Sequence, residues 1–63
     1  LKIAVANNCV TVSDNATITV TDMNGRTVAS GIGSTLAISH LTPGAYIVKA
    51  RTNTDTNTIK FIK

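Results

Sequence analysis

The feature that most constrains the fold is an alternation of apolar and polar side chains that recurs along most of the chain. Thr, Val and Ile, which favour strands, dominate these alternating stretches. Turn-forming clusters interrupt them about every 8 to 12 residues, a spacing typical of β-sandwiches and barrels. Helix is hard to place anywhere. The sequence therefore predicts an all-β, antiparallel β-sandwich of about seven short strands.

Period-two alternation also gives the limits of the strands and the side chains that face inward. The expected strands are Leu1–Ala6, Cys9–Ser13, Ala16–Asp22, Arg26–Ser30, Thr35–Ile38, Ala45–Thr52 and Thr58–Ile62. The expected inward side chains are Leu1, Ile3, Val5, Val10, Val12, Ile18, Val20, Val28, Leu36, Ile38, Tyr46, Val48, Ala50, Ile59 and Phe61. Ile47 and Ile62 are expected to point outward.

Size and composition bound the function. A chain of 63 residues has room for one domain with a thin core, and its only cysteine, Cys9, cannot form an internal disulfide. A net charge of +3 with only Tyr46 and Phe61 as aromatics argues against nucleic-acid binding. No apolar run reaches the roughly 20 residues that direct membrane insertion needs. We expect residues 1–63 to be one domain, the C-terminal fragment of a larger precursor.

The segment Asp22–Arg26 predicts a β-hairpin. A two-residue Asn-Gly turn would send Val20 and Val28 to opposite faces of the sheet. A three-residue loop that ends at Gly25 instead places Val20 opposite Val28, with the glycine at positive φ. We therefore expect the three-residue loop.

The segment Thr42–Ala45 predicts a type II turn, because Pro43 fixes φ at the second position and Gly44 tolerates positive φ at the third. Tyr46 follows at the start of the longest expected strand. Its ring can fill the core while its hydroxyl reaches back to upstream backbone, as in a tyrosine corner.

The polar segment Asn53–Thr56 is expected to form a four-residue loop between the last two strands. This loop places Val48 opposite Phe61. It also places Ala50 opposite Ile59, which keeps the inward face apolar.

The same register places Lys49 directly opposite Lys60, with Arg51 nearby. Like charges that face each other are unfavourable unless something acidic screens them. The stripe is interpreted either as a surface that a partner binds or as charge that protects exposed strands from aggregation.

Candidate catalytic and metal-binding residues are few. His40 and Cys9 are the only candidates for a nucleophilic dyad, and no third group is evident that would orient the histidine. One histidine, one cysteine and three dispersed aspartates do not make a spaced ligand set. We expect no enzyme activity, no cofactor and no metal.

Three segments resemble the C-terminal sorting domain of type IX, or Por, secretion. They are Ile18–Arg26, Leu41–Lys49 and Lys60–Lys63, and with them the resemblance covers nearly the whole chain. The positions that match family motifs are Gly25 and Arg26 in the hairpin, Pro43, Gly44 and Tyr46 at the strand start, and Lys60 and Lys63 at the basic terminus. The terminal lysines depart from the family's wider spacing, and three residues apart they lie on opposite faces of a straight strand.

The resemblance implies an immunoglobulin-like sandwich that the type IX secretion translocon recognises in the periplasm. An N-terminal passenger of the same precursor then crosses the outer membrane to the cell surface or is secreted. In this family a surface sortase commonly removes the domain. In addition to the motif positions, Lys49 and Arg51 are expected to be recognised by the secretion machinery.

Two further interpretations stay open. The chain is alternatively a generic immunoglobulin-like or fibronectin-like accessory module, which spaces domains or binds carbohydrate in an extracellular protein. Its thin sandwich with exposed edges and an unpaired Cys9 also suggests a homodimer formed by strand pairing or exchange.

Overall fold

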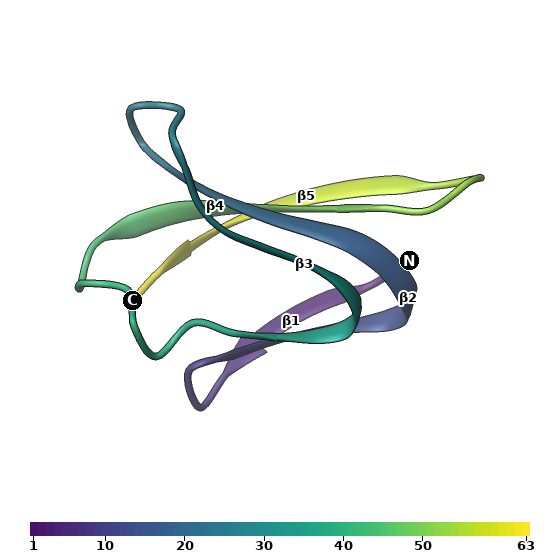
Figure 1. Cartoon of the computed structure of the whole chain (residues 1–63), viewed down its shortest axis with the longest axis horizontal. Coiled ribbons are helices and arrows are strands. Elements are labelled where there is room, and N and C mark those ends of the chain that lie inside the picture. The colour runs from purple at the N-terminus through teal and green to yellow at the C-terminus, as the bar shows by residue number, and fades with distance from the viewer.

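The structure is a computed structural model that describes residues 1–63 and contains five strands and no helix. The strands are β1 (Ile3–Ala6), β2 (Cys9–Asp22), β3 (Thr27–Ala37), β4 (Ala45–Arg51) and β5 (Thr56–Ile62). They form one antiparallel sheet in the order β1-β2-β4-β5, with β3 paired to β2 (Figure 1). The expected all-β antiparallel class is confirmed. Because the fold has no helix, it offers no helical membrane span.

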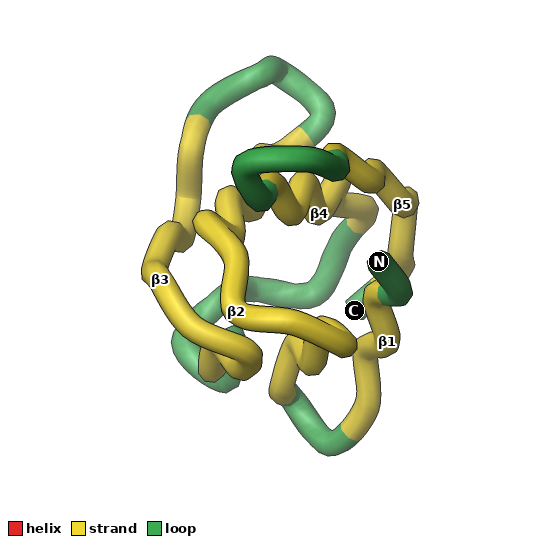
Figure 2. The backbone as a smooth tube through the Cα atoms, turned by 90° about the vertical axis from the view of Figure 1, so that its right-hand side faces the viewer, coloured by secondary structure: helices red, strands yellow, loops and turns green.

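β2 turns the sheet into a curled layer. Its first half pairs with β1 and with the end of β3, whereas its second half pairs with the start of β3 and with β4. The register between β2 and β3 shifts between Thr11 and Ala16, and such bulges bend a strand. The strands consequently surround a common interior, as the end-on view in Figure 2 shows.

The expected number of seven strands is wrong, because β2 and β3 continue through segments that the sequence marks as breaks. Asp14 and Asn15 lie within β2, and Gly31–Ser34 lies within β3. At the bulge of β2, pairing with β1 keeps the chain extended, since Val12 still lies opposite Ile3. The four expected segments in this region are thus the halves of two long bent strands.

The core follows the expected alternation closely. Every expected inward side chain is buried or half-buried, and Ile62 is exposed as expected. Two buried residues were not expected, Ala16 in β2 and Leu41 in the loop before β4. Leu41 turns inward because its amide donates to the Ile38 carbonyl at 3.1 Å, which closes a tight turn. Local alternation carries no signal for a side chain in such a loop.

The hairpin between β2 and β3 has the expected three-residue loop. Gly25 has φ of 83°, and its amide donates to the Asp22 carbonyl at 3.1 Å. The expected pairing of Val20 with Val28 is wrong, because Val20 lies opposite Ala29. A second register shift inserts the extra residue, and bulges of this kind are common beside hairpins.

Gly25→Ala is expected to destabilise the chain by about 1 kcal/mol or more, because an L-residue resists positive φ. Space is not the reason, since a Cβ at this position would meet nothing within 4 Å. Urea unfolding measures the loss. Asn24→Ala is the matched control, because Asn24 is exposed and does not have positive φ. Equal stability of the Gly25 variant and the native chain would contradict the strain argument.

The register of β4 and β5 differs by two residues from the expected one. Val48 lies opposite Ile59, not Phe61. Ala50 lies opposite Asn57. A shift of two residues leaves every side chain on its original face, so apolar alternation cannot distinguish the two registers.

Side-chain hydrogen bonds explain the observed register. The hydroxyl of Thr52 accepts from the amides of Asp55 at 2.9 Å and Thr54 at 3.3 Å, which closes the loop one residue earlier than expected. On the inward face, the amide group of Asn57 donates to the Leu1 carbonyl at 3.0 Å. That bond satisfies a polar side chain where an apolar one was expected and joins β5 to the start of the chain.

Candidate functional site

Half of the chain's six cationic side chains lie on the outer face of β4 and β5. Lys49 and Arg51 are exposed on β4, where they alternate with the fully buried Val48 and Ala50. Lys60 is exposed on the neighbouring strand β5. We call the surface formed by Lys49, Arg51 and Lys60 the cationic face.

Acids border the cationic face only at one end, where Arg51 lines a groove together with Asp14 and Asp55. The cations of the face form no salt bridge, since the two ion pairs of the structure are Leu1 with Asp55 and Arg26 with Asp22. The side chains opposite Lys49 on the neighbouring strands are Thr19 and Thr58. The face therefore presents positive charge that is not paired in salt bridges, with hydroxyl groups on both sides of Lys49.

The expected direct opposition of Lys49 and Lys60 is wrong. Lys60 lies opposite Ile47, and Lys49 lies opposite Thr58, as the two-residue change of register requires. Diagonal neighbours of this kind are about 7–8 Å apart, which lowers the repulsion that direct opposition would cause. The three cations remain one cluster without a strained contact.

The hairpin tip holds Arg26 apart from this cluster. The Asp22 carboxylate accepts from the Arg26 backbone amide at 3.0 Å, from the Asn24 amide at 2.9 Å and from the Arg26 Nε at 3.3 Å. These bonds, the one from the Arg26 amide first, hold the pKa of Asp22 below its usual value. Arg26 therefore stands beside a carboxylate that is ionised at neutral pH, and the tip presents less net charge than the cationic face.

Tyr46 has a structural position inside the curled sheet. Its hydroxyl donates to the Thr42 carbonyl at 2.6 Å, so the expected tyrosine corner is confirmed. Its buried ring stacks on Phe61 of β5, with ring centroids 5.7 Å apart and planes inclined by 28°. Tyr46 shapes the site from within rather than presenting a surface group.

The expected type II turn before Tyr46 is wrong. Gly44 has φ of 159°, far from the roughly 80° of that turn. Gly44 instead exchanges two backbone hydrogen bonds with Lys63, at 2.8 and 3.3 Å, and so extends the pairing of β4 with β5. Pro43 precedes this pair as an exposed residue of the connecting loop.

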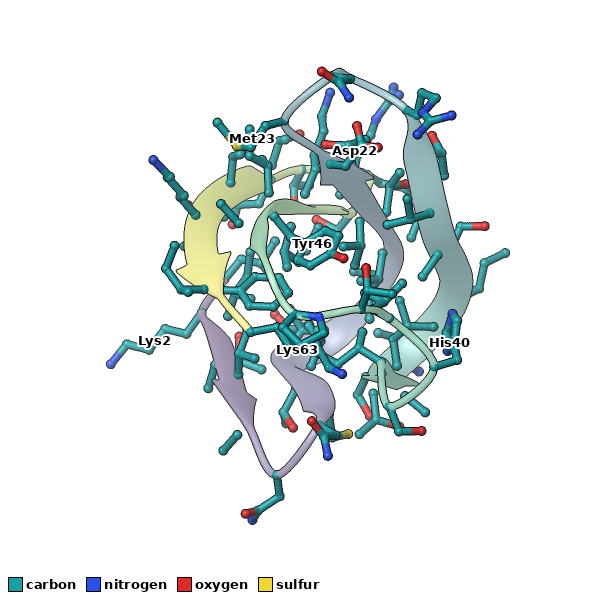
Figure 3. The ribbon with its side chains drawn as sticks, turned by 90° about the vertical axis from the view of Figure 1, so that its left-hand side faces the viewer. Lys2, Asp22, Met23, His40, Tyr46 and Lys63 are labelled. Atoms are coloured by element: carbon teal, nitrogen blue, oxygen red, sulfur yellow. The ribbon has the colours of Figure 1, made fainter.

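Lys63 is tied to the same loop by its side chain. Its Nζ donates to the Leu41 carbonyl at 2.5 Å, and the residue is half-buried. Figure 3 shows Lys63 close to Tyr46 at one end of the molecule. Lys60 therefore lies on the cationic face, whereas Lys63 helps to close this end of the molecule.

Seven of the nine expected site residues thus divide into two groups, and the exposed Arg26 and Pro43 belong to neither. Gly25, Gly44, Tyr46 and Lys63 hold backbone or core, whereas Lys49, Arg51 and Lys60 form the exposed cluster. Asp22, Leu41 and Thr42 were not among the expected site residues. Leu41 and Thr42 act through backbone carbonyls, which side-chain patterns do not reveal.

The remaining candidate groups form no reaction centre. His40 is exposed in the loop before β4, and the half-buried Cys9 directs its thiol to the Val10 carbonyl at 3.6 Å. No three His, Cys, Asp or Glu side chains come together as metal ligands. One open, mainly polar groove lies between the bend of β2 and the β4–β5 loop, with Asp14 and Asp55 among its lining residues.

Comparison with known proteins gives one match. The family described as the secretion system C-terminal sorting domain matches residues 2–63. No curated protein and no solved structure matches the chain.

Proposed function

The chain belongs to the secretion system C-terminal sorting domains, and we propose that its cationic face is the surface that the secretion machinery binds. It is a C-terminal sorting signal of type IX secretion, and such a signal directs an N-terminal passenger across the outer membrane to the surface or to the medium. The finer steps are our proposal. The precursor passes through the periplasm, and a surface sortase removes the domain after export.

The observation that carries the binding proposal is the cluster of Lys49, Arg51 and Lys60 on one exposed face, where none of them forms a salt bridge. Unpaired charge on one face speeds encounter with a surface of opposite sign and selects against surfaces of the same sign. The partner surface is therefore acidic. Arg26 and Pro43, both exposed, lie outside this face and remain predictions from the family motifs.

We further propose that the curled sheet is a continuous form of the immunoglobulin-like sandwich expected for the family. The halves of β2 and β3, counted separately, restore seven strand segments. Strands that pass from one layer to the other through bulges are a known way to build corners in packed sheets.

The chain acts as a substrate of secretion rather than as a catalyst. Asp22 in the hairpin and Lys63 in the closing loop have structural roles. The alternative, a carbohydrate-binding accessory module, finds less support, because such modules use exposed aromatic platforms. Tyr46 is buried and Phe61 is half-buried here. A homodimer is a separate matter, because it does not follow from family membership.

The sorting role is tested by fusing residues 1–63 to the C-terminus of a periplasmic reporter in a bacterium that has a type IX system. We expect the reporter at the cell surface or in the medium, and loss of that export when Lys60–Lys63 is deleted. The deletion has two physical effects, since it removes the Phe61 ring from Tyr46 as well as the Lys63 bonds to Gly44 and Leu41.

The same fusion in a strain without the translocon is the control, and there the reporter stays in the periplasm. Export of the truncated fusion at the native level would refute the role of this terminus. Export of the full fusion without the translocon would refute the type IX assignment itself.

A further inference from the structure

β3 has one unpaired edge along its whole length. It pairs with β2 on one side, and no strand pairs with it on the other. In Figures 2 and 3, which view the molecule from opposite sides, β3 runs along the margin. Residues Thr27–Ala37 thus offer unsatisfied backbone donors and acceptors to another strand.

This edge has register shifts in its ladder with β2, but it lacks the charged and proline residues that usually protect against pairing. Natural edge strands carry charged side chains or proline, are short, or are twisted by bulges. β3 has 11 residues with neither a charge nor a proline, and its central residue, Ile32, is 86% exposed. It is the most exposed large apolar side chain of the protein. Two glycines flank it, and Gly33, with φ of 142°, marks the bulge where the ladder with β2 shifts register.

We propose that β3 binds β3 of a second copy, antiparallel, around a two-fold axis at Ile32. A two-fold contact is self-complementary, so the centre of the strand meets itself. The two Ile32 side chains then form a cross-strand apolar pair, and Gly31 of each copy faces Gly33 of the other. One surface on each copy is sufficient, and it is the one that the fold leaves open.

Charge favours a second copy over a charged partner at this edge. β3 has no cation that could attract an acidic strand, so only a neutral strand fits it without loss. The nearest part of the cationic face, on β4, is separated from β3 by β2. At about 4.8 Å per strand, the two copies' β4 strands stand about 24 Å apart across the dimer, well beyond the screening length of about 8 Å at physiological salt. Repulsion between the β4 cations of the two copies is therefore largely screened.

The contact is expected to be weak. One strand edge buries less area than the roughly 1,200 Å² of a stable interface, so the dissociation constant should be on the order of 0.1 mM. The cationic face stays exposed in the dimer. Pairing through β3 and binding of the secretion machinery are accordingly compatible.

Sedimentation equilibrium of the 63-residue chain tests the proposal, from about 10 µM to about 1 mM, a range that brackets the expected constant. The native chain should pass from monomer to dimer. Ile32→Lys places two ammonium groups opposite each other, and the dissociation constant should rise at least about tenfold. Ile62→Lys is the matched control, because Ile62 is another isoleucine, 72% exposed, on a different strand.

Thermal unfolding at low concentration separates association from folding. Both lysine variants should melt as the native chain does, because both side chains are exposed in the monomer. A native chain that is still monomeric at about 1 mM overturns the proposal, since the expected constant is about tenfold lower. A dimer that Ile32→Lys leaves intact overturns it too, and would point to strand exchange. Neither result bears on the sorting role, which the export of the reporter measures independently.

Discussion

Tyr46→Ala will remove a large share of the domain's free energy of unfolding. Removing a buried aromatic ring typically costs about 3–5 kcal/mol, because packing is lost and a cavity remains. A domain of this length has a total stability of roughly 3–9 kcal/mol, at about 0.05–0.15 kcal/mol per residue. The ring of Tyr46 is 6% exposed and stacks on Phe61, so little of this loss can be recovered by solvent or by collapse.

Tyr46→Phe separates the ring from its hydroxyl. The ring and its contact with Phe61 remain, and the hydrogen bonds of the hydroxyl with the Thr42 carbonyl and the Thr42 hydroxyl are lost, which should cost about 0.5–1.5 kcal/mol for each bond. Urea unfolding followed by circular dichroism measures both variants. A Tyr46→Ala loss of less than about 1 kcal/mol would show that the tyrosine corner does not hold β4 against β5, contrary to the usual cost of such truncations.

Reversing the cationic face will reduce export of a fused reporter at least about tenfold while the domain stays folded. The triple variant Lys49→Glu, Arg51→Glu and Lys60→Glu replaces attraction to an acidic partner by repulsion, and like-charge contacts at an interface cost several kcal/mol. A loss of about 1.4 kcal/mol in binding free energy lowers the affinity tenfold. Even part of the expected repulsion is therefore enough for a tenfold loss of export. All three side chains are exposed and form no salt bridge, so the fold loses no ion pair of theirs.

The controls for this variant come from the same chain. Lys2→Glu reverses an exposed cation outside the cationic face and should leave export unchanged. Arg26→Glu reverses the cation at the hairpin tip, and a loss of export there would place the recognised surface at the tip. If the folded triple variant is exported at the native level, the cationic face is not part of the sorting signal, and the family assignment still holds.

Stability and recognition are therefore divided between different residues of the same motifs. Tyr46, Gly44 and Lys63 close one end of the sheet, and their substitution should lower export by unfolding the signal. Substitution of Lys49, Arg51 and Lys60 should lower export without unfolding the domain. Export and urea unfolding measured together distinguish the two groups.

The sequence determined the strand class, the inward face and the tyrosine corner. Each of these rests on local chemistry: alternation assigns side chains to faces, and a tyrosine that opens a strand four residues after Thr42 can reach that backbone. The three-residue hairpin loop with Gly25 was predictable for the same reason. The family motifs at Gly25, Pro43 and Lys60 were also visible in the sequence, and they led to the sorting family.

Only the tertiary structure decided which residues lie side by side across strands. Alternation is unchanged when one strand slides by two residues, so the β4–β5 register had to be set by the Thr52 hydroxyl in the loop and by Asn57 bonding to Leu1. The bends of β2 and β3 were hidden as well, because a strand held by a neighbour continues through residues that locally favour a turn. Those long-range bonds place Lys49 diagonal to Lys60 and leave the edge of β3 open, and no local pattern contains them.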